Sequence, residues 1–211
     1  KLYIIKIMKQ NKNFLNALDD WGAVLSDTYE KATITHRVVP SENMCGELVV
    51  PEYYAYKYNI QNKQESIKGQ VYIPEGVTEI NSRAFINCEE IFSIDLPDSI
   101  RVIDDYVFAH CTKLQAVSIP DKVEHIQMGV FLKCNSLKNV TFPKYLKLIN
   151  NFAFSGCSIL SGELVIPETV KYVGLFAFAD TNLDKIYVPK DMVKNWDEEW
   201  NDRCPAEIVY Y

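Results

Sequence analysis

Prolines recur along most of the chain at an almost constant distance, and this repeat constrains the fold more than any other feature. Successive members of the series are 22 to 24 residues apart. The series consists of Pro74, Pro97, Pro120, Pro143, Pro167 and Pro189. A repeat of roughly 20–50 residues is typical of solenoids. We therefore expect a stack of coils that offers a long, regular surface rather than a single pocket.

Apolar positions between the prolines keep the same period. The repeated positions are Ile80, Ile103, Ile126, Ile149 and Val173; Phe85, Phe108, Phe131, Phe154 and Phe178; Cys88, Cys111, Cys134 and Cys157; and Ile91, Leu114, Leu137, Leu160 and Leu183. One such unit is too short for two helices of average length, which excludes a helix-pair repeat. Before each proline the residues alternate inward and outward, as at Val140, Thr141 and Phe142, which predicts a strand. Proline ends that strand because it lacks the N–H needed for further pairing.

The repeat, V-x-x-I-x-x-x-A/V-F-x-x-C-x-x-L-x-x-I-x-I/L-P, resembles the BspA-like leucine-rich repeats of bacterial surface proteins. The resemblance covers about residues 69–190 and is carried by five successive F-x-x-C/T-x-x-L/I blocks. It implies an α/β leucine-rich-repeat solenoid, a strand-rich right-handed superhelix with a parallel sheet. It also implies a non-catalytic binding module, displayed at the cell surface or secreted, that acts in adhesion or host-protein recognition.

The chain divides into three expected regions. Residues 1–44 are expected to form an N-terminal cap or entry region, residues 45–190 the repeats, and residues 191–211 a C-terminal cap. Within the repeats the first unit is degenerate: residues 46–51 closely copy residues 162–167, and regular units begin at about residue 69. The C-terminal cap is predicted to be a helix that ends before Pro205, because its apolar residues recur at helical spacing. These residues are Met192, Val193, Trp196 and Trp200.

Four periodic cysteines favour a ladder of buried thiols. Cysteine is among the residues most often buried and packs as a small apolar group. A disulfide between neighbouring coils and a metal site are the alternatives. A metal site needs ligands that converge on one point, whereas a stack places its cysteines in a line. A disulfide fits poorly because side chains in register point the same way. Cys45 and Cys204 are expected to lie outside the ladder.

Composition argues against several functions. The chain has 22 basic and 28 acidic residues, a net charge of −6, and no dense basic run, so nucleic acid is not an expected partner. No apolar run is long enough to span a membrane, and residues 1–10 lack the features of a signal peptide. The histidines, His36, His110 and His125, share no spacing, and no nucleotide, metal or nucleophile motif occurs. We expect no cofactor, no metal and no enzymatic activity; an enzyme with catalytic groups in residues 1–68 is the remaining alternative.

The outward-facing strand positions are the candidate binding residues, and the resemblance places them on the concave face of the solenoid. They are Tyr72, Ser93, Asp95, Ser118, Asn139, Thr141, Glu163, Lys185 and Tyr187. Small polar side chains in the middle leave room for a partner, and tyrosines at the two ends are common contact anchors. The expected partner is a protein, such as a host or extracellular-matrix protein. Glycan binding by the tyrosines is the alternative.

Overall fold

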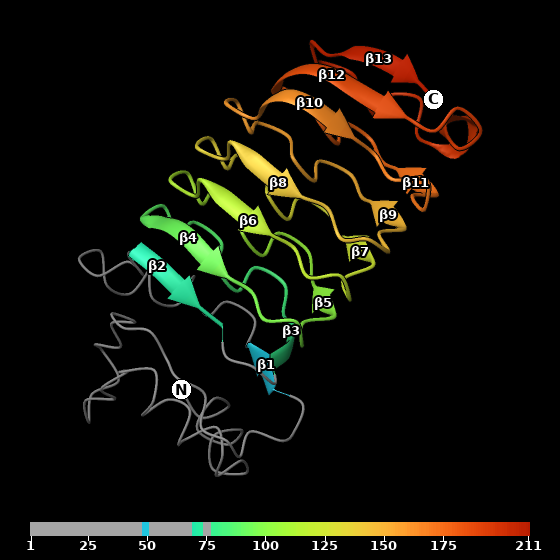
Figure 1. Cartoon of the computed structure of the whole chain (residues 1–211). Coiled ribbons are helices and arrows are strands. Elements are labelled where there is room, and N and C mark those ends of the chain that lie inside the picture. Colours follow the sequence, from blue (N-terminus) through green and yellow to red (C-terminus); the bar gives the residue numbers. More distant parts are fainter. Residues whose placement is uncertain (1–47, 51–68, 74–76) are drawn as a thin grey trace, which may run out of the picture.

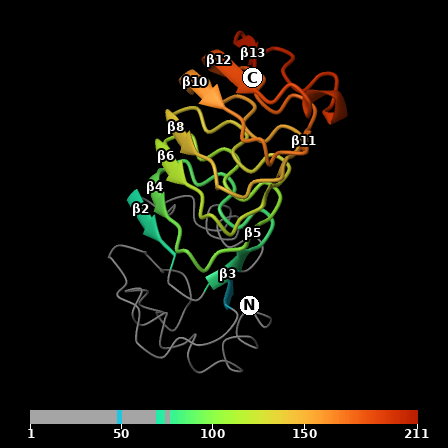
Figure 2. The same cartoon turned by 45° about the vertical axis from the view of Figure 1, so that its right-hand side comes forward.

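The computed structural model describes residues 48–50, 69–73 and 77–211, which coil into a solenoid of short parallel strands (Figure 1). The strands form two series, which lie on opposite sides of the coil (Figure 2). The first, here called the strand face, consists of β2 (Gly69–Tyr72), β4 (Ile91–Asp95), β6 (Ala116–Ser118), β8 (Asn139–Thr141), β10 (Ser161–Val165), β12 (Asn182–Val188) and β13 (Glu207–Tyr210). The second, the rear face, consists of β1 (Leu48–Val50), β3 (Val77–Ile80), β5 (Val102–Ile103), β7 (His125–Ile126), β9 (Leu148–Ile149) and β11 (Tyr172–Val173).

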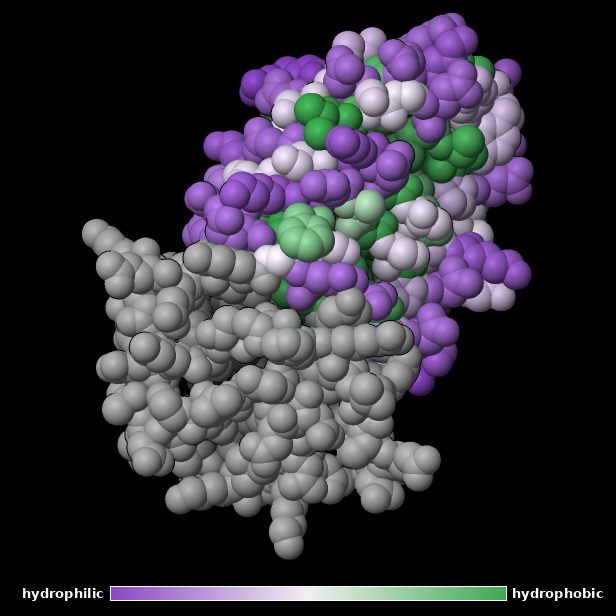
Figure 3. All heavy atoms as spheres, turned by 60° about the vertical axis from the view of Figure 1, so that its left-hand side comes forward, coloured by the Kyte–Doolittle hydropathy of each residue, from purple (hydrophilic) through white to green (hydrophobic). Residues whose placement is uncertain are grey.

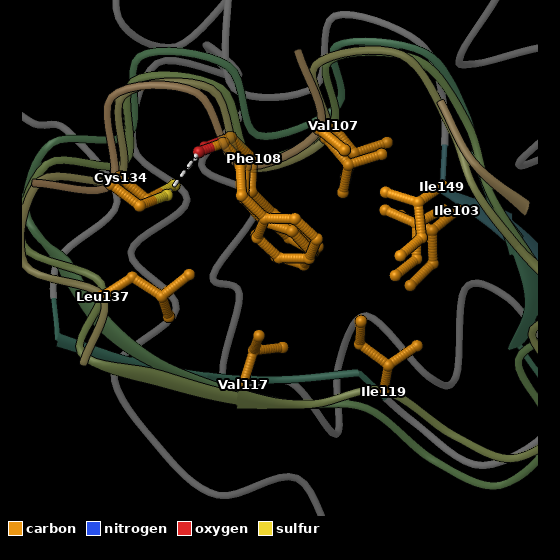
Figure 4. Close-up of a cluster of buried hydrophobic side chains, with 14 of the residues drawn as sticks. Ile103, Val107, Phe108, Val117, Ile119, Cys134, Leu137 and Ile149 are labelled. Carbon is orange, nitrogen blue, oxygen red and sulfur yellow. Dashed lines mark hydrogen bonds between the residues drawn. The ribbon is translucent and has the colours of Figure 1, made fainter. Parts of the chain in front are cut away.

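A continuous stack of phenylalanine rings runs through the core. Neighbouring ring centroids in the series from Phe85 to Phe178 are 5.3–5.6 Å apart, and the ring planes are tilted by at most 19°. Phe131 lies between Phe108 and Phe154, as the repeat predicts. The Ile, Val and Leu residues of the repeat surround the rings and are also buried (Figure 4). Each coil therefore buries its apolar side chains against the next one along.

The turn segments that join the two series are also bonded from coil to coil. The N–H groups of Phe85, Phe108, Phe131 and Phe154 each donate to a carbonyl oxygen of the next coil over 2.8–3.0 Å. A buried backbone N–H without a partner is costly. This ladder supplies a partner where the chain is neither helix nor strand. It explains how a coil with only a few strand residues remains regular.

Buried thiols form a second ladder in the core, which confirms the expectation for the periodic cysteines. Cys88, Cys111, Cys134 and Cys157 are fully buried, and none of the five described cysteines forms a disulfide. Three thiols donate to the carbonyl oxygen of a phenylalanine in the preceding coil over 3.1–3.2 Å: Cys111 to Phe85, Cys134 to Phe108 and Cys157 to Phe131. Figure 4 shows the bond from Cys134.

The predicted C-terminal helix is wrong. After Pro189 the chain forms only a three-residue 3-10 turn, η1 (Val193–Asn195), and then continues as another coil that ends in β13. β13 pairs in parallel with β12, from Lys185 opposite Glu207 to Val188 opposite Tyr210. The α component of the expected α/β class is accordingly missing from the described residues, apart from η1.

Trp200 gives the physical reason for this extra coil. It takes the place of the next phenylalanine and packs edge-on against Phe178, with a centroid distance of 6.3 Å. Trp196 packs edge-on against Trp200 in turn. Cys204, expected outside the ladder, lies beside Thr181, with 3.4 Å between Sγ and Oγ1. Tertiary packing and strand pairing thus outweigh a helical pattern short enough to be marginal alone.

The first unit differs from the expectation in another way. The likeness of residues 46–51 to residues 162–167 predicts a strand on the same face as β10. Instead β1 pairs with β3 on the rear face. The predicted N-terminal cap, residues 1–44, and the catalytic alternative in residues 1–68 lie outside the described residues, except for β1 itself.

Each series of strands is interrupted once, at different places. On the strand face β2, β4, β6 and β8 form one sheet and β10, β12 and β13 another; on the rear face the break falls between β5 and β7. The coil of β10, just after the break on the strand face, contains an extra residue, since Pro143 and Pro167 are 24 residues apart. The ring stack continues across it, with Phe131 and Phe154 at 5.3 Å.

Candidate binding surface

The strand face presents its outward side chains in columns that cross the strands. Parallel pairing places Ser93, Ala116 and Asn139 in one column. It places Ser118 and Thr141 in a second, two residues further along each strand. Val71, Ile94 and Val117 point into the core from alternate positions. The register that the sequence predicts for this face is therefore confirmed for the described strands.

Short side chains occupy the middle of the strand face. Four exposed side chains lie there, and the longest of them is that of an asparagine. They are Ala116, Ser118, Asn139 and Thr141. Asp95 is exposed one strand earlier, and Ser93 is half-buried. A surface of this kind allows a partner to approach the backbone closely and offers hydroxyl and amide groups for hydrogen bonds.

The C-terminal end of the strand face has longer and more strongly interacting side chains. Glu163, Lys185 and Glu207 form one column and Val165, Tyr187 and Val209 the other. Lys185 Nζ lies 3.2 Å from Glu207 Oε2. The hydrogen bond to Glu207, assisted by charges nearby, raises the pKa of Lys185, so this side chain is cationic at neutral pH.

The predicted binding residues occupy the places expected for them, although their part in binding stays a prediction. Tyr187 is half-buried, and its hydroxyl donates to Glu163 Oε2 over 3.2 Å. Tyr72 lies opposite Asp95 in the strand register, and its side chain lies outside the described part of the structure. Sequence reasoning missed Glu207 and Val209, because residues 191–211 were expected to form a cap with a helix that ends before Pro205, and no further strand was predicted. The distance from Thr181 to Cys204, 23 residues, was the available signal for another coil.

The described histidines lie apart from one another, and the buried cysteine thiols stay protonated. His110 lies in a turn with a positive φ of 62°, whereas His125 is exposed on the rear strand β7. Burial raises the pKa of Cys111 and Cys134 well above the ordinary value and that of Cys157 to about 12, so the thiolate nucleophile is not formed at neutral pH. Within residues 48–50, 69–73 and 77–211, no group of three His, Cys, Asp or Glu side chains is placed to hold a metal ion.

On the face that Figure 3 shows, hydrophobic side chains are interspersed with polar ones. On the side that lies to the left in Figure 1, polar side chains predominate and hydrophobic ones form small separate patches (Figure 3). The most exposed large apolar residue besides the C-terminal tyrosines is Val165, at 57%. No helix in the described ranges is long and apolar enough to cross a membrane.

Parallel strands on two sides of a short repeated coil, with a buried ring and thiol ladder, define a leucine-rich-repeat solenoid. The family model described as BspA type Leucine rich repeat region matches residues 58–183 in six copies. The chain therefore belongs to the BspA-type leucine-rich-repeat family. No curated protein matches the chain at a significant level.

Two solved structures show the same fold. A leucine-rich repeat protein from Bacteroides ovatus is 24% identical, with a TM-score of 0.59, and the match covers 68% of this chain and 41% of that one. The leucine-rich repeat protein of T. pallidum is 21% identical, with a TM-score of 0.51, and the match covers 78% of this chain and 86% of that one. The chain thus corresponds to less than half of the Bacteroides protein.

Proposed function

We propose that this chain is a non-catalytic binding module of a bacterial surface or secreted protein, and that it acts in adhesion or in recognition of a host protein through its strand face. The observation that carries the proposal is the run of exposed short polar side chains across β6 and β8, flanked by larger groups toward β12. Solenoids bind by area along such surfaces, with a few residues dominating the affinity.

A protein partner suits this surface better than a glycan does. Sugar rings stack on flat, accessible aromatic faces. Tyr187, a tyrosine predicted to stack on sugars, is half-buried, and its hydroxyl is already bonded to Glu163. The central columns instead offer hydroxyl, amide and carboxylate groups over several strands, which matches an extended polypeptide or a folded protein surface.

A steric block in the middle of the strand face tests the proposal. The variant Ser118→Arg with Thr141→Arg places two long side chains side by side on neighbouring strands. His125→Arg, on the rear strand β7, is the matched control. Binding to immobilised extracellular-matrix and serum proteins is measured by surface plasmon resonance, with a glycan array in parallel.

The double variant is expected to lose at least about tenfold in affinity for a protein that the wild type binds, with the control unchanged. Equal binding by all three forms would place the contact elsewhere. Binding confined to the glycan array would favour the accessory carbohydrate-binding role instead.

A further inference from the structure

The break between β8 and β10 divides the strand face into two parts of different chemistry. On β6 and β8, the two strands before the break, the exposed side chains are short, as at Ser118 and Thr141. After it, the sheet of β10, β12 and β13 carries a column of large apolar groups beside a column of charges. We call this second part the C-terminal panel; it consists of Glu163, Val165, Lys185, Tyr187, Glu207 and Val209.

The apolar column of the panel is continuous across three strands. Val165 is 57% exposed, and Tyr187 and Val209 are half-buried beside it in register. Neighbouring strands lie about 4.8 Å apart, so the column extends over about 10 Å. Three adjacent apolar side chains of this kind form a small contact surface for an apolar group of a partner.

The charged column carries an excess of negative charge. Lys185 is engaged by the carboxylate of Glu207, at 3.2 Å, and its single positive charge lies between two glutamates. The side chain of Glu207 remains 65% exposed despite this ion pair. Glu163 is exposed, and so is Asp184 beside the panel. Three carboxylates against one ammonium group leave a local field that attracts cations and repels anions.

We propose that the C-terminal panel binds an extended, cationic segment of a partner protein, with an apolar side chain on the Val165–Tyr187–Val209 column and Lys or Arg side chains on Glu163 and Glu207. This proposal rests on the proposed function and names the chemistry of the partner at one part of the same surface. Charge complementarity selects a basic segment, and the exposed apolar column beside the charges selects one that also carries apolar residues.

The spacing of the two glutamates favours a particular backbone. Glu163 and Glu207 are two strands apart, which is about 9.6 Å at 4.8 Å for each strand. A polyproline II segment lying across the strands repeats its side-chain direction every three residues, about 9.3 Å. Basic residues three positions apart in such a segment therefore reach both carboxylates, whereas an alternating β-strand places residues three apart on opposite sides.

Synthetic peptides test this directly. The probe is a fluorescein-labelled peptide that repeats Arg-Pro-Val, so that its bases recur every three residues. One comparison peptide repeats Glu-Pro-Val and reverses the charge; another repeats Arg-Pro-Ser and removes the apolar group. Fluorescence anisotropy at low and high salt measures their affinity for the full chain. We expect the first peptide to bind, the charge-reversed peptide not to bind, and the serine peptide to bind more weakly.

Variants of the panel then separate this site from general attraction to an acidic protein. The double variant Glu163→Gln with Glu207→Gln is expected to lower the affinity for the Arg-Pro-Val peptide roughly three- to tenfold at low salt, since two exposed ion pairs with the peptide are lost. Asp98→Asn with Glu168→Gln removes the same charge from turns outside the panel and is expected to leave affinity within about twofold. Both pairs are exposed, and a thermal melt checks that the fold is kept.

Equal weakening by the two pairs of variants, or no binding of the Arg-Pro-Val peptide, would overturn the proposal. Those results would not decide whether the strand face binds a protein, which the steric variant Ser118→Arg with Thr141→Arg tests separately. A third outcome is a protein partner whose binding is lost in the steric variant but unchanged in Glu163→Gln with Glu207→Gln. That result would support the proposed binding module and contradict the proposal that its partner binds through a cationic segment.

Discussion

At the scale of single residues, a core position in this solenoid contacts its equivalents in the coils before and after it. Phe131 shows this most clearly, because its ring packs between Phe108 and Phe154 at 5.6 and 5.3 Å. Its N–H and carbonyl groups also join neighbouring coils: the N–H donates to Ala153, and the carbonyl accepts from the thiol of Cys157. A substitution there affects three coils at once.

Replacing Phe131 with alanine is therefore expected to lower the free energy of unfolding by about 3–5 kcal/mol, the usual cost of truncating a buried phenylalanine. Urea unfolding followed by circular dichroism gives the measurement. Lys138→Ala, at an exposed position in the same coil, serves as the control. A midpoint close to that of the wild type would show that Phe131 is not a core residue.

The buried thiols give a prediction for alkaline pH. Burial raises the pKa of Cys111, Cys134 and Cys157 above the ordinary value of 9.0, in the last case to about 12. Above pH 9 the unfolded thiols lose their protons and the folded ones keep them, so these groups stabilise the fold below about pH 9 and lose that contribution as the pH rises toward 12. The slope for one fully buried thiol is at most about 1.4 kcal/mol per pH unit.

Unfolding free energies measured from pH 8 upward are expected to fall less steeply for Cys157→Ala than for the wild type, because the variant has one thiol fewer to ionise on unfolding. A thiol reagent applied at neutral pH provides a second check. Mass spectrometry should find the four ladder cysteines labelled only after denaturation. Labelling of native Cys134 would contradict the buried ladder.

At the scale of elements, an aromatic contact, a pair of strands and hydrogen bonds between turns join the last coil to the one before it. Trp200 closes the ring stack against Phe178, and β13 pairs with β12. Asp180 and Arg203 occupy the same kind of left-handed turn, with φ of 56° and 60°, and their side chains form an ion pair at 2.8 Å. This coil thus repeats the backbone of the one before it although its sequence lacks the A-F landmark.

Trp200→Ala is expected to detach this coil while leaving the central coils folded. Amide hydrogen exchange should show lost protection at Ile208–Val209 and retained protection around Phe131, because stability in a solenoid is carried by contacts between neighbouring coils. Trp200→Phe restores a ring of the repeat type and should keep most of the protection. Unchanged exchange in β13 of the alanine variant would show that the aromatic contact is not needed to hold the coil.

The period of the landmarks was enough to predict the coil, the inward and outward register of the strands and the phenylalanine and cysteine ladders. These features follow from local alternation and from a strict repeat, both visible in the residues themselves. The last coil was not predicted, because Met192, Trp196 and Trp200 also fit a helical face and only packing against Phe178 decides between the two. The place of β1 on the rear face depends on pairing with β3, which the likeness of residues 46–51 to residues 162–167 does not encode.

At the scale of the whole molecule, the junction between the third and fourth regular coils has strand pairing on one face only. β8 and β10 are not paired there, so strand pairing joins these coils only through β7 and β9. The stacking of Phe131 on Phe154 and the hydrogen bonds between the turn segments supply further contacts. The next junction has strand pairing on both faces, β9 with β11 and β10 with β12.

Phe154→Ala is accordingly expected to uncouple the two halves, giving two resolved unfolding transitions where the wild type gives one. Phe178→Ala removes an equivalent ring where both faces are paired, and a single broadened or shifted transition is expected for it. Scanning calorimetry distinguishes the two outcomes. Identical single transitions in both variants would show that the unpaired strands do not weaken the junction.

The two breaks in strand pairing fall at different junctions, one between β5 and β7 and the other between β8 and β10. No junction between neighbouring regular coils therefore lacks strand pairing on both faces. Under a mechanical load along the axis, each junction between regular coils retains at least one paired row of strands and one ring contact. A molecule built in this way is expected to yield coil by coil from its ends under tension, instead of parting abruptly at its middle.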